Sequence, residues 1–339
     1  MNNALETLFL PFLQGHVHIA PEAPNGFFGA QLHPIMSEMG FKALYLQQDF
    51  KPYAARLSEA GHEVHADMPQ DNAKFSHAFV LLPKNKIEAH YKIASALRVL
   101  TEGGMIIVAA DNKAGGSRLS KMLSAFGVSD IDDLSKNKAR AAWGIKSKLD
   151  EQAIHSALSA GAMQKASHGF ISQPGIYGWD KIDKGSELLA AHLPSTLQGV
   201  GADFGCGYGY LSHNILQISD KLEALYCIDA DRRAVSACQK NLQNAADLNF
   251  KWSDITSAAF SLPALDFIVM NPPFHEGKKT DAQIGQAFIE TAARSLKKGG
   301  SLWMVANAHL PYEKILHRNF NDVKCVVEQR GFKVFHAVR

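Results

Sequence analysis

The chain has 339 residues, of which 46% are hydrophobic and 20% are charged, and its formal net charge is +2. At roughly 150 residues per domain, this length predicts two globular domains. The composition excludes a collagen-like, coiled-coil or disordered chain, because it supplies enough apolar residues for two cores. The small positive charge neither requires nor excludes a nucleic-acid partner.

No stretch approaches the ~20 consecutive apolar residues that cross a bilayer. The first ten residues lack the basic start of a signal peptide. We therefore expect a cytoplasmic protein without a membrane partner. The four cysteines, Cys206, Cys227, Cys238 and Cys325, include no C-x-x-C pair. This spacing favours free thiols over disulfides or a metal site.

Apolar runs typical of buried parallel strands recur along the chain, with amphipathic segments of helical length between them. The expected strands cover residues 78–82, 105–109, 226–229, 267–270 and 301–305. The expected helices include residues 87–99 and 286–296. This alternation predicts an α/β fold in which helices cover both faces of a mostly parallel sheet.

Two distant segments resemble each other: residues 100–111 read LTEGGMIIVAAD, and residues 296–307 read LKKGGSLWMVAN. An apolar run that ends in proline precedes each segment. The resemblance predicts two copies of one α/β fold. We place the first copy at residues 1–150, a linker at 151–166 and the second copy at 167–339.

A glycine-rich turn in the second copy is the first candidate site. Gly205, Gly207 and Gly209 follow a predicted strand and precede a predicted helix, where glycine permits positive φ and a close approach of ligand to backbone. Asp203 lies just before the turn, and Asp229 ends the next strand. A carboxylate there can accept the ribose hydroxyls of an adenosine-bearing cofactor. A dinucleotide site stays possible, although the spacing departs from G-x-G-x-x-G.

The second candidate site is the sequence Asn271-Pro272-Pro273-Phe274, which directly follows the expected strand 267–270. Consecutive prolines fix φ and brace an extended turn at the carboxyl end of that strand. The Asn271 side-chain oxygen and the Pro272 carbonyl can together accept both hydrogens of an exocyclic amine. Phe274 can stack on the flat ring that carries this amine.

In this order, the glycine turn, Asp229 and the Asn-Pro-Pro-Phe turn resemble class I S-adenosyl-L-methionine-dependent methyltransferases that modify planar amino groups. The resemblance covers residues 167–339. The doubled architecture and the segment 182–189 make the whole chain similar to tandem-domain guanine-N2 methyltransferases of small-subunit (16S) ribosomal RNA. The resemblance implies two tandem methyltransferase-like domains, each with a mostly parallel, seven-stranded Rossmann-like sheet. It also implies 16S rRNA or the small ribosomal subunit as partner.

The resemblance assigns roles in binding S-adenosyl-L-methionine. The three glycines would face its methionine part, with Asp203 near the amino group. Asp229 would hold the ribose, and Asp254 would approach the adenine amine. The alternative for Asp254 is a loop aspartate that caps a helix.

The resemblance also assigns the acceptor side: Asn271 and Pro272 would hold the guanine amine, and Phe274 would contact the base. No metal site is expected, because the histidines show no ligand spacing.

The first copy lacks these motifs. Residues 81–84 read LLPK, and residues 1–150 contain no G-x-G-x-G turn. We expect a non-catalytic domain that either holds RNA or supports the second copy, and a doubled chain that stays a monomer. Residues 134–149 have two interpretations: they contact RNA, or they form a solvated charged face. This segment contains Trp143 and five basic residues: Lys136, Lys138, Arg140, Lys146 and Lys148.

Other chemistries fit the same turn. A large-subunit guanine-N2, an adenine-N6 or a protein glutamine-amide methyltransferase would also present a planar amine or amide to Asn271. A ribosome assembly factor without catalysis would keep only the fold.

Overall fold

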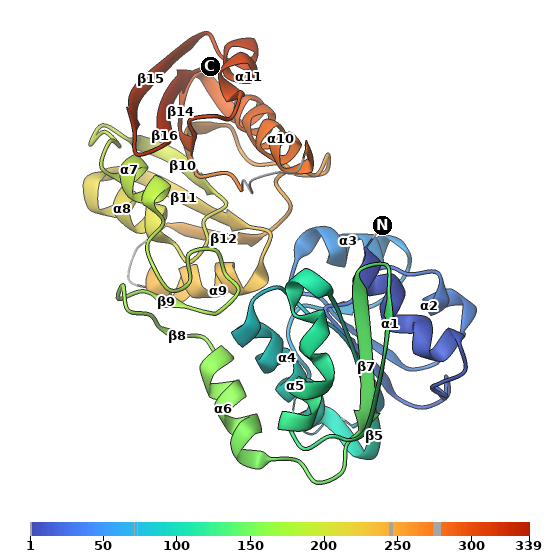
Figure 1. Ribbon diagram of the computed structural model, residues 1–339. Helices are drawn as coiled ribbons and strands as arrows, with labels where there is room; N and C mark the ends of the chain where they lie inside the picture. The colour runs from blue at the N-terminus through green and yellow to red at the C-terminus, as the bar shows by residue number, and fades with distance from the viewer. Residues whose placement is uncertain (1, 71, 73, 244–246, 274–278) are drawn as a thin grey trace. The chain divides into compact units, whose positions relative to one another are not determined.

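The computed structural model describes residues 2–70, 72, 74–243, 247–273 and 279–339. The chain divides into two compact units, Met1–Ala162 and Met163–Arg339 (Figure 1).

The first unit forms one seven-stranded sheet within its described residues. The strands are β1 (Asn25–Phe28), β2 (Leu44–Gln47), β3 (Val64–His65), β4 (Phe75–Leu81), β5 (Leu100–Asp111), β6 (Ser129–Lys136) and β7 (Ala139–Ile145). The α-helices are α1 (Asn3–Leu13), α2 (Ile35–Glu38), α3 (Lys51–Glu59), α4 (Lys86–Val99), α5 (Leu119–Ala125) and α6 (Glu151–Gly161). Two short 3₁₀ helices, Asn112–Ala114 and Gly116–Arg118, precede α5.

The second unit forms a seven-stranded sheet and a short hairpin in the part that is described. The hairpin pairs β8 (Gln164–Lys165) with β9 (Ile171–Ser172). The sheet strands are β10 (Gln198–Phe204), β11 (Lys221–Asp229), β12 (Leu248–Trp252), β13 (Leu265–Met270), β14 (Leu296–Asn307), β15 (Asp322–Gln329) and β16 (Phe332–Val338). The helices are α7 (Lys184–Ala190), α8 (Tyr210–Ile218), α9 (Arg232–Asn241), α10 (Lys279–Ser295) and α11 (Tyr312–Asn319).

The two sheets have the same topology, which confirms the expected repeat. Their strand orders are β3-β2-β1-β4-β5-β7-β6 and β12-β11-β10-β13-β14-β16-β15. In both, the first five strands run parallel and the last hairpin is antiparallel. The resembling segments 100–111 and 296–307 are β5 and β14.

Both sheets are buried on two faces, because crossover helices cover them. In the second unit, alternate residues of β13 enter different cores: Ile268 and Met270 pack with α10 and α11, whereas Phe267 and Val269 pack with α7, α8 and α9. Figure 1 shows these helices on opposite sides of the sheet. Full burial of a side chain such as Phe267 contributes roughly 1.5–3 kcal/mol.

The segment expected as a linker, residues 151–166, contains helix α6. The Asp150 carboxylate caps this helix by accepting the Ala153 N–H at 2.9 Å. Ile154 and Ala157 then enter the core of the first unit beside α4. The first unit therefore extends to Ala162.

Two of the five basic residues of the segment 134–149 are engaged within the first unit. Arg140 of β7 pairs with Asp133 of β6, and Lys146 donates to the Leu100 carbonyl at 2.9 Å. Trp143 is only 6% exposed. Among the expected basic residues, Lys136, Lys138 and Lys148 are exposed. The structure therefore offers a smaller basic surface than the sequence indicated.

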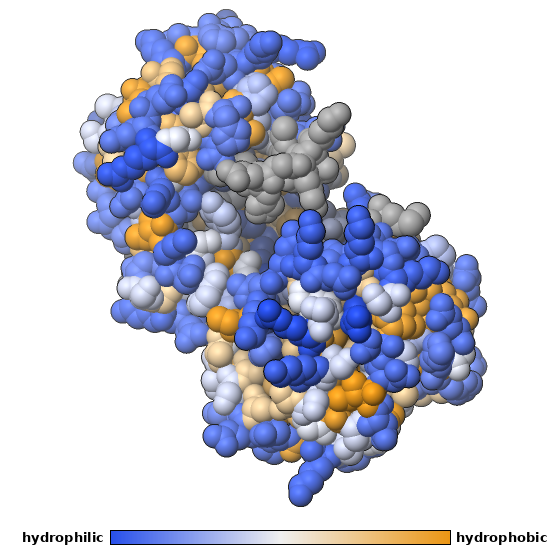
Figure 2. All heavy atoms as spheres, viewed as in Figure 1, coloured by the Kyte–Doolittle hydropathy of each residue, from blue (hydrophilic) through white to orange (hydrophobic). Residues whose placement is uncertain are grey.

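The face drawn in Figure 2 is mainly hydrophilic, with hydrophobic residues in separate groups. No described helix has both the length and the apolar character needed to span a membrane. All four cysteines are free thiols.

Candidate functional site

Four neighbouring strands of the second sheet deliver the predicted site residues to one edge. The order β12-β11-β10-β13 places the carboxyl ends of these parallel strands side by side. Asp254 follows β12, Asp229 ends β11, the glycine loop follows β10, and Asn271 follows β13. Ligands in open α/β sheets bind at this edge.

The glycine loop connects β10 to α8 through three residues with positive φ: Gly205 at +78°, Gly207 at +55° and Gly209 at +94°. The N–H groups of Gly205 and Cys206 both donate to the Ile228 carbonyl, at 2.8 and 2.9 Å. A Cβ atom on Gly207 would meet nothing within 4 Å. The loop thus turns sharply at its start and leaves open space at its middle glycine.

Asp203 is completely buried at the end of β10. Its Oδ2 accepts the Ser212 hydroxyl of α8 at 2.6 Å, whereas its buried Oδ1 has no hydrogen-bond partner in the described structure. Burial raises the pKa of the Asp203 carboxyl to about 7, against the opposing hydrogen bonds from Ser212. A buried oxygen without a partner can accept a hydrogen bond from a ligand or lie against a cationic group of that ligand.

Asp229 is partly exposed and holds the glycine loop in place. Its Oδ2 accepts the Gly207 N–H at 2.9 Å, and its Oδ1 accepts the Asp231 N–H at 2.8 Å. Burial raises the pKa of Asp229 to about 6, while these hydrogen bonds oppose the shift. The Ala230 N–H also bonds to this carboxylate. A carboxylate has about four acceptor sites, so Asp229 can still accept a hydroxyl.

Asp254 lies in the loop after β12. Its Oδ1 accepts the Thr256 N–H at 2.9 Å and the Thr256 hydroxyl at 2.6 Å, which closes a turn. Asp254 therefore closes a local turn, and no helix begins in this fully described loop, so the expected helix cap is not found.

The turn after β13 brings Asn271 next to the glycine loop. Strand residues Phe204 and Met270 are register partners, and an added Gly205 Cβ would lie 4.0 Å from the Asn271 carbonyl oxygen. Pro272 is buried and Pro273 is exposed. Phe274, the fourth residue of the predicted motif, lies outside the described residues.

The Asn271 side chain is oriented by Asp183 and Ser186, two residues of the segment 182–189 to which the sequence analysis assigned no contact. Its Nδ2 donates to Asp183 Oδ2 at 2.9 Å and to Ser186 Oγ at 2.8 Å. Its Oδ1 is buried without a partner in the described part of the chain. The Asp-x-x-Ser spacing at 183–186 was a sequence signal, but it indicated a cap and not a contact with Asn271.

Asn241 is a second residue that sequence reasoning missed. Its amide nitrogen, at the end of α9, donates to the carbonyls of Ile171 and Tyr208, both at 2.8 Å. Its oxygen accepts the Ile171 N–H at 2.7 Å. One side chain therefore ties β9 to the glycine loop.

The first unit has different groups at the corresponding strand ends. Gln47, at the end of β2, accepts the Gly29 N–H at 3.1 Å, and Gln48 donates to the Ala30 carbonyl at 2.6 Å. Both glutamines are buried. The residue after β4 is Leu82, followed by Pro83. Neutral, internally bonded amides thus stand where the second unit has the Asp229 carboxylate.

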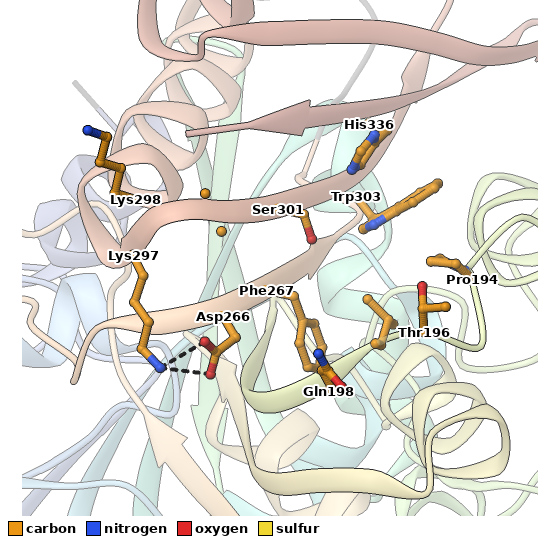
Figure 3. A pocket seen from close by; sticks show the side chains of 13 residues that line it. Pro194, Thr196, Gln198, Asp266, Phe267, Lys297, Lys298, Ser301, Trp303 and His336 are labelled. Carbon is orange, nitrogen blue, oxygen red and sulfur yellow. Dashed lines mark hydrogen bonds and ion pairs between the residues drawn. The ribbon is translucent and has the colours of Figure 1, made fainter.

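A shallow cavity of about 480 Å³ lies at the opposite edge of the second sheet. Figure 3 shows Asp266 paired with Lys297, and the ring of Trp303 beside that of His336. The centroids of these two rings are 4.5 Å apart. These residues surround the amino ends of β10, β13 and β14. The cavity therefore does not include the glycine loop or Asn271.

Three features of the second unit fit a nucleoside-bearing cofactor. They are the space over Gly207, the unpartnered Asp203 oxygen and the carboxylate of Asp229. No cluster of potential metal ligands occurs among the described residues.

The repeated sheet with one glycine-lined site defines a tandem-domain class I methyltransferase. Two family models match the chain: the methyltransferase small domain at residues 167–336 and its N-terminal domain at residues 12–159.

Two curated relatives carry the name "Ribosomal RNA small subunit methyltransferase C". The Shewanella baltica (strain OS195) protein is 30% identical over 81% of this chain and 80% of its own length. The Salmonella arizonae protein is 33% identical over 76% of this chain and 73% of its own length. The chain belongs to the family of ribosomal RNA small subunit methyltransferase C.

The fold of the chain also matches that of a solved structure. The T. thermophilus 16S rRNA N2 methyltransferase, determined with AdoMet and guanosine, superposes with a TM-score of 0.81 at 22% identity. The match covers 100% of this chain and 92% of that protein. The expected tandem fold is therefore confirmed.

Proposed function

We propose that the protein transfers a methyl group from S-adenosyl-L-methionine to the exocyclic N2 amine of a guanine in small-subunit (16S) ribosomal RNA. The observation that carries this proposal is the Asn271 amide. Its Nδ2 is fully engaged, and its buried Oδ1 is left to accept from an amine beside the glycine loop. A buried acceptor without a partner costs about 1–3 kcal/mol, which a substrate N–H would recover.

On the cofactor side, Gly205, Gly207 and Gly209 would face the methionine part, and Asp203 Oδ1 would accept from its ammonium group. Asp229 would accept from the ribose, since its carboxylate retains acceptor capacity beside its backbone hydrogen bonds. Asp254 would accept from the adenine amine through its Oδ2. When bound, S-adenosyl-L-methionine supplies a methyl group that its sulfonium charge already activates.

On the acceptor side, Asn271 Oδ1 and the Pro272 carbonyl would each accept one hydrogen of the amine. These contacts hold the nitrogen in line with the donor and turn its lone pair toward it. Phe274 would stack on the guanine. The proton lost from the methylated amine passes to water, because an alkylated aromatic amine is acidic. The target guanine must leave its stack to reach this turn, unless its strand is already single-stranded.

The relatives' names favour RNA of the small subunit over the large subunit, DNA or a protein glutamine as substrate. We propose 16S rRNA or the small ribosomal subunit as the partner, with a monomeric protein acting in the cytoplasm. We also propose that the first unit is non-catalytic, because Gln47 and Gln48 fill its strand ends.

The test is nucleoside mass spectrometry after incubating the purified chain with S-adenosyl-L-methionine and either small-subunit particles or naked 16S rRNA. We expect N2-methylguanosine. Replacing Asn271 by Ala should lower turnover at least about a hundredfold, as loss of a transition-state hydrogen bond does, with the cofactor Kd unchanged. The exposed Asn321 provides a matched Asn321→Ala control with wild-type turnover. Methylated adenine or protein without N2-methylguanosine would contradict the proposal.

A further inference from the structure

The amide of Asn271 is held by the first turn of α7, a segment distant in sequence. Asp183 lies 88 positions before Asn271, and Ser186 lies 85 positions before it. Asp183 Oδ2 and Ser186 Oγ each accept one of the two Nδ2 hydrogens, at 2.9 and 2.8 Å. Every donor of the Asn271 amide is therefore used by the protein itself.

The chemistry of Asp183 allows only one orientation of that amide. A carboxylate is an acceptor without a hydrogen to donate. Rotating the Asn271 amide by half a turn would place its oxygen against the Asp183 oxygen, and two acceptors at that distance repel. Asp183 therefore holds the Asn271 Nδ2 toward the start of α7 and leaves Oδ1 for a ligand.

Asp183 carries more hydrogen bonds than a helix cap needs. Its Oδ2 also accepts the Ser186 N–H at 2.8 Å, which is the cap of α7. Its Oδ1 accepts the Tyr177 hydroxyl at 2.8 Å. Asp150, which caps α6, accepts the Ala153 N–H with one oxygen. The additional hydrogen bonds hold both oxygens of the Asp183 carboxylate in place.

The start of α7 is also packed tightly, so it cannot shift freely. A Cβ atom added to Gly185 would lie 3.0 Å from Asp183 Oδ2 and 3.1 Å from the Phe332 ring of β16. The position of Asp183 is thus tied to the sheet that carries the site.

We propose that Asp183, assisted by Ser186, is a positioning residue for methyl transfer: it fixes the Asn271 amide so that Oδ1 faces the amine being methylated. The inference rests on the proposed function, because it takes Asn271 as the group that contacts the amine. Asp183 and Ser186 act through Asn271 and have no contact of their own with the reacting nitrogen.

The first test compares kcat with KM in two variants. Asp183→Asn keeps a good helix cap but removes the acceptor-only carboxylate. It should lower kcat about ten- to a hundredfold, the range of a hydrogen bond to a charged group, with the RNA KM and cofactor Kd within about twofold. Ser186→Ala should lower kcat about three- to tenfold. Asp150→Asn is the matched cap control and should keep wild-type kcat.

A purely structural role gives a different pattern. Asp183→Asn would then lower the melting temperature together with activity, and Ser186→Ala would leave kcat unchanged. Either result overturns the proposal. A double-mutant cycle provides a further check: in the Asn271→Ala background, Asp183→Asn should cost less than about twofold in kcat. A full additional loss would show that Asp183 acts independently of Asn271.

A nuclear magnetic resonance experiment separates this inference from the proposed function. The Asn271 side-chain amide signals can be assigned by their absence in Asn271→Ala. They should shift in Asp183→Asn and in Ser186→Ala and stay unchanged in Asp150→Asn. Unchanged signals in the first two variants overturn the positioning role for any substrate. Absence of N2-methylguanosine from the wild-type reaction overturns the proposed function alone.

Discussion

Asp229 accepts the backbone N–H of Gly207 at 2.9 Å, so a carboxylate at the end of β11 shapes the loop that follows β10. The same carboxylate accepts the Asp231 N–H through its other oxygen, at 2.8 Å. Both backbone groups are donors, and both need an acceptor at this strand end. The residue proposed to bind the ribose therefore also holds the cofactor loop.

We predict that Asp229→Asn raises the Kd for S-adenosyl-L-methionine about ten- to a hundredfold. The side-chain amide of this variant has only one oxygen. Whichever way it turns, its NH₂ group therefore faces the backbone N–H of Gly207 or of Asp231, and the unpaired N–H costs about 1–3 kcal/mol. Isothermal titration calorimetry measures the change. Asp220→Asn, at an exposed residue just before β11, should bind as the wild type does. Equal affinities in both variants would contradict this role of Asp229.

We predict that each chain binds one S-adenosyl-L-methionine. In the first unit, the buried Gln47 and Gln48 satisfy the backbone groups of residues 29 and 30. These neutral amides are already bonded within the unit, and the carboxylate that follows them, Asp49, pairs with Lys92 at 3.6 Å. Titration calorimetry should give a stoichiometry near one, and Asp229→Ala should abolish binding without revealing a second site. Two binding events per wild-type chain would refute the assignment.

The positions of several strands and the two motifs of the second unit could be predicted from the sequence, because they depend on local patterns. Apolar runs marked the strands whose two faces are covered by helices, such as β13. The repeated segments correspond to β5 and β14. Asp203 and Gly205 could be located because a strand and a turn are adjacent in the chain.

Contacts between distant segments could not be predicted in this way. Residues 151–161 have the small residues of a linker, yet Ile154 is fully buried against the first core. The charge of Arg140 is paired with Asp133 across an antiparallel hairpin, which charge counting along the chain misses. The bond between Asp183 and Asn271 joins residues 88 positions apart and requires the folded sheet.

We predict that Asp203 and Asp229 make a contribution to stability that falls as the pH rises between about 4 and 7. Burial raises the pKa of Asp203 to about 7 and that of Asp229 to about 6, above the ordinary value of about 3.9 in an unfolded chain. Between these values the folded chain binds more protons than the unfolded chain. The contribution is complete below pH ~4 and is lost as the pH passes through the folded-state pKa values.

The Asp203→Asn variant tests this linkage, because it removes the group with the larger shift. Urea unfolding should show that the free energy of unfolding of the wild type falls by on the order of 2 kcal/mol more than that of the variant between pH 5 and pH 8. Asp220→Asn should keep the wild-type slope. An identical slope in Asp203→Asn would mean that Asp203 is ionised at pH 5 in the folded protein.

Gly207 and Gly209 should respond differently to alanine. At Gly209 (φ +94°) a Cβ would lie 2.8 Å from Cys238 Sγ and 3.3 Å from its Cα, so α9 must move. Positive φ adds about 1–2 kcal/mol of strain. Gly209→Ala should therefore lower the melting temperature by several degrees and weaken cofactor binding.

At Gly207, by contrast, a Cβ would meet nothing within 4 Å, so only modest backbone strain opposes Gly207→Ala. The added methyl group occupies the space over the loop where the cofactor is proposed to lie. We expect a melting temperature closer to the wild type than that of Gly209→Ala, with a Kd for S-adenosyl-L-methionine at least about tenfold higher. Thermal unfolding and calorimetry on both variants measure the two effects. Wild-type cofactor affinity in Gly207→Ala would place the cofactor away from this loop.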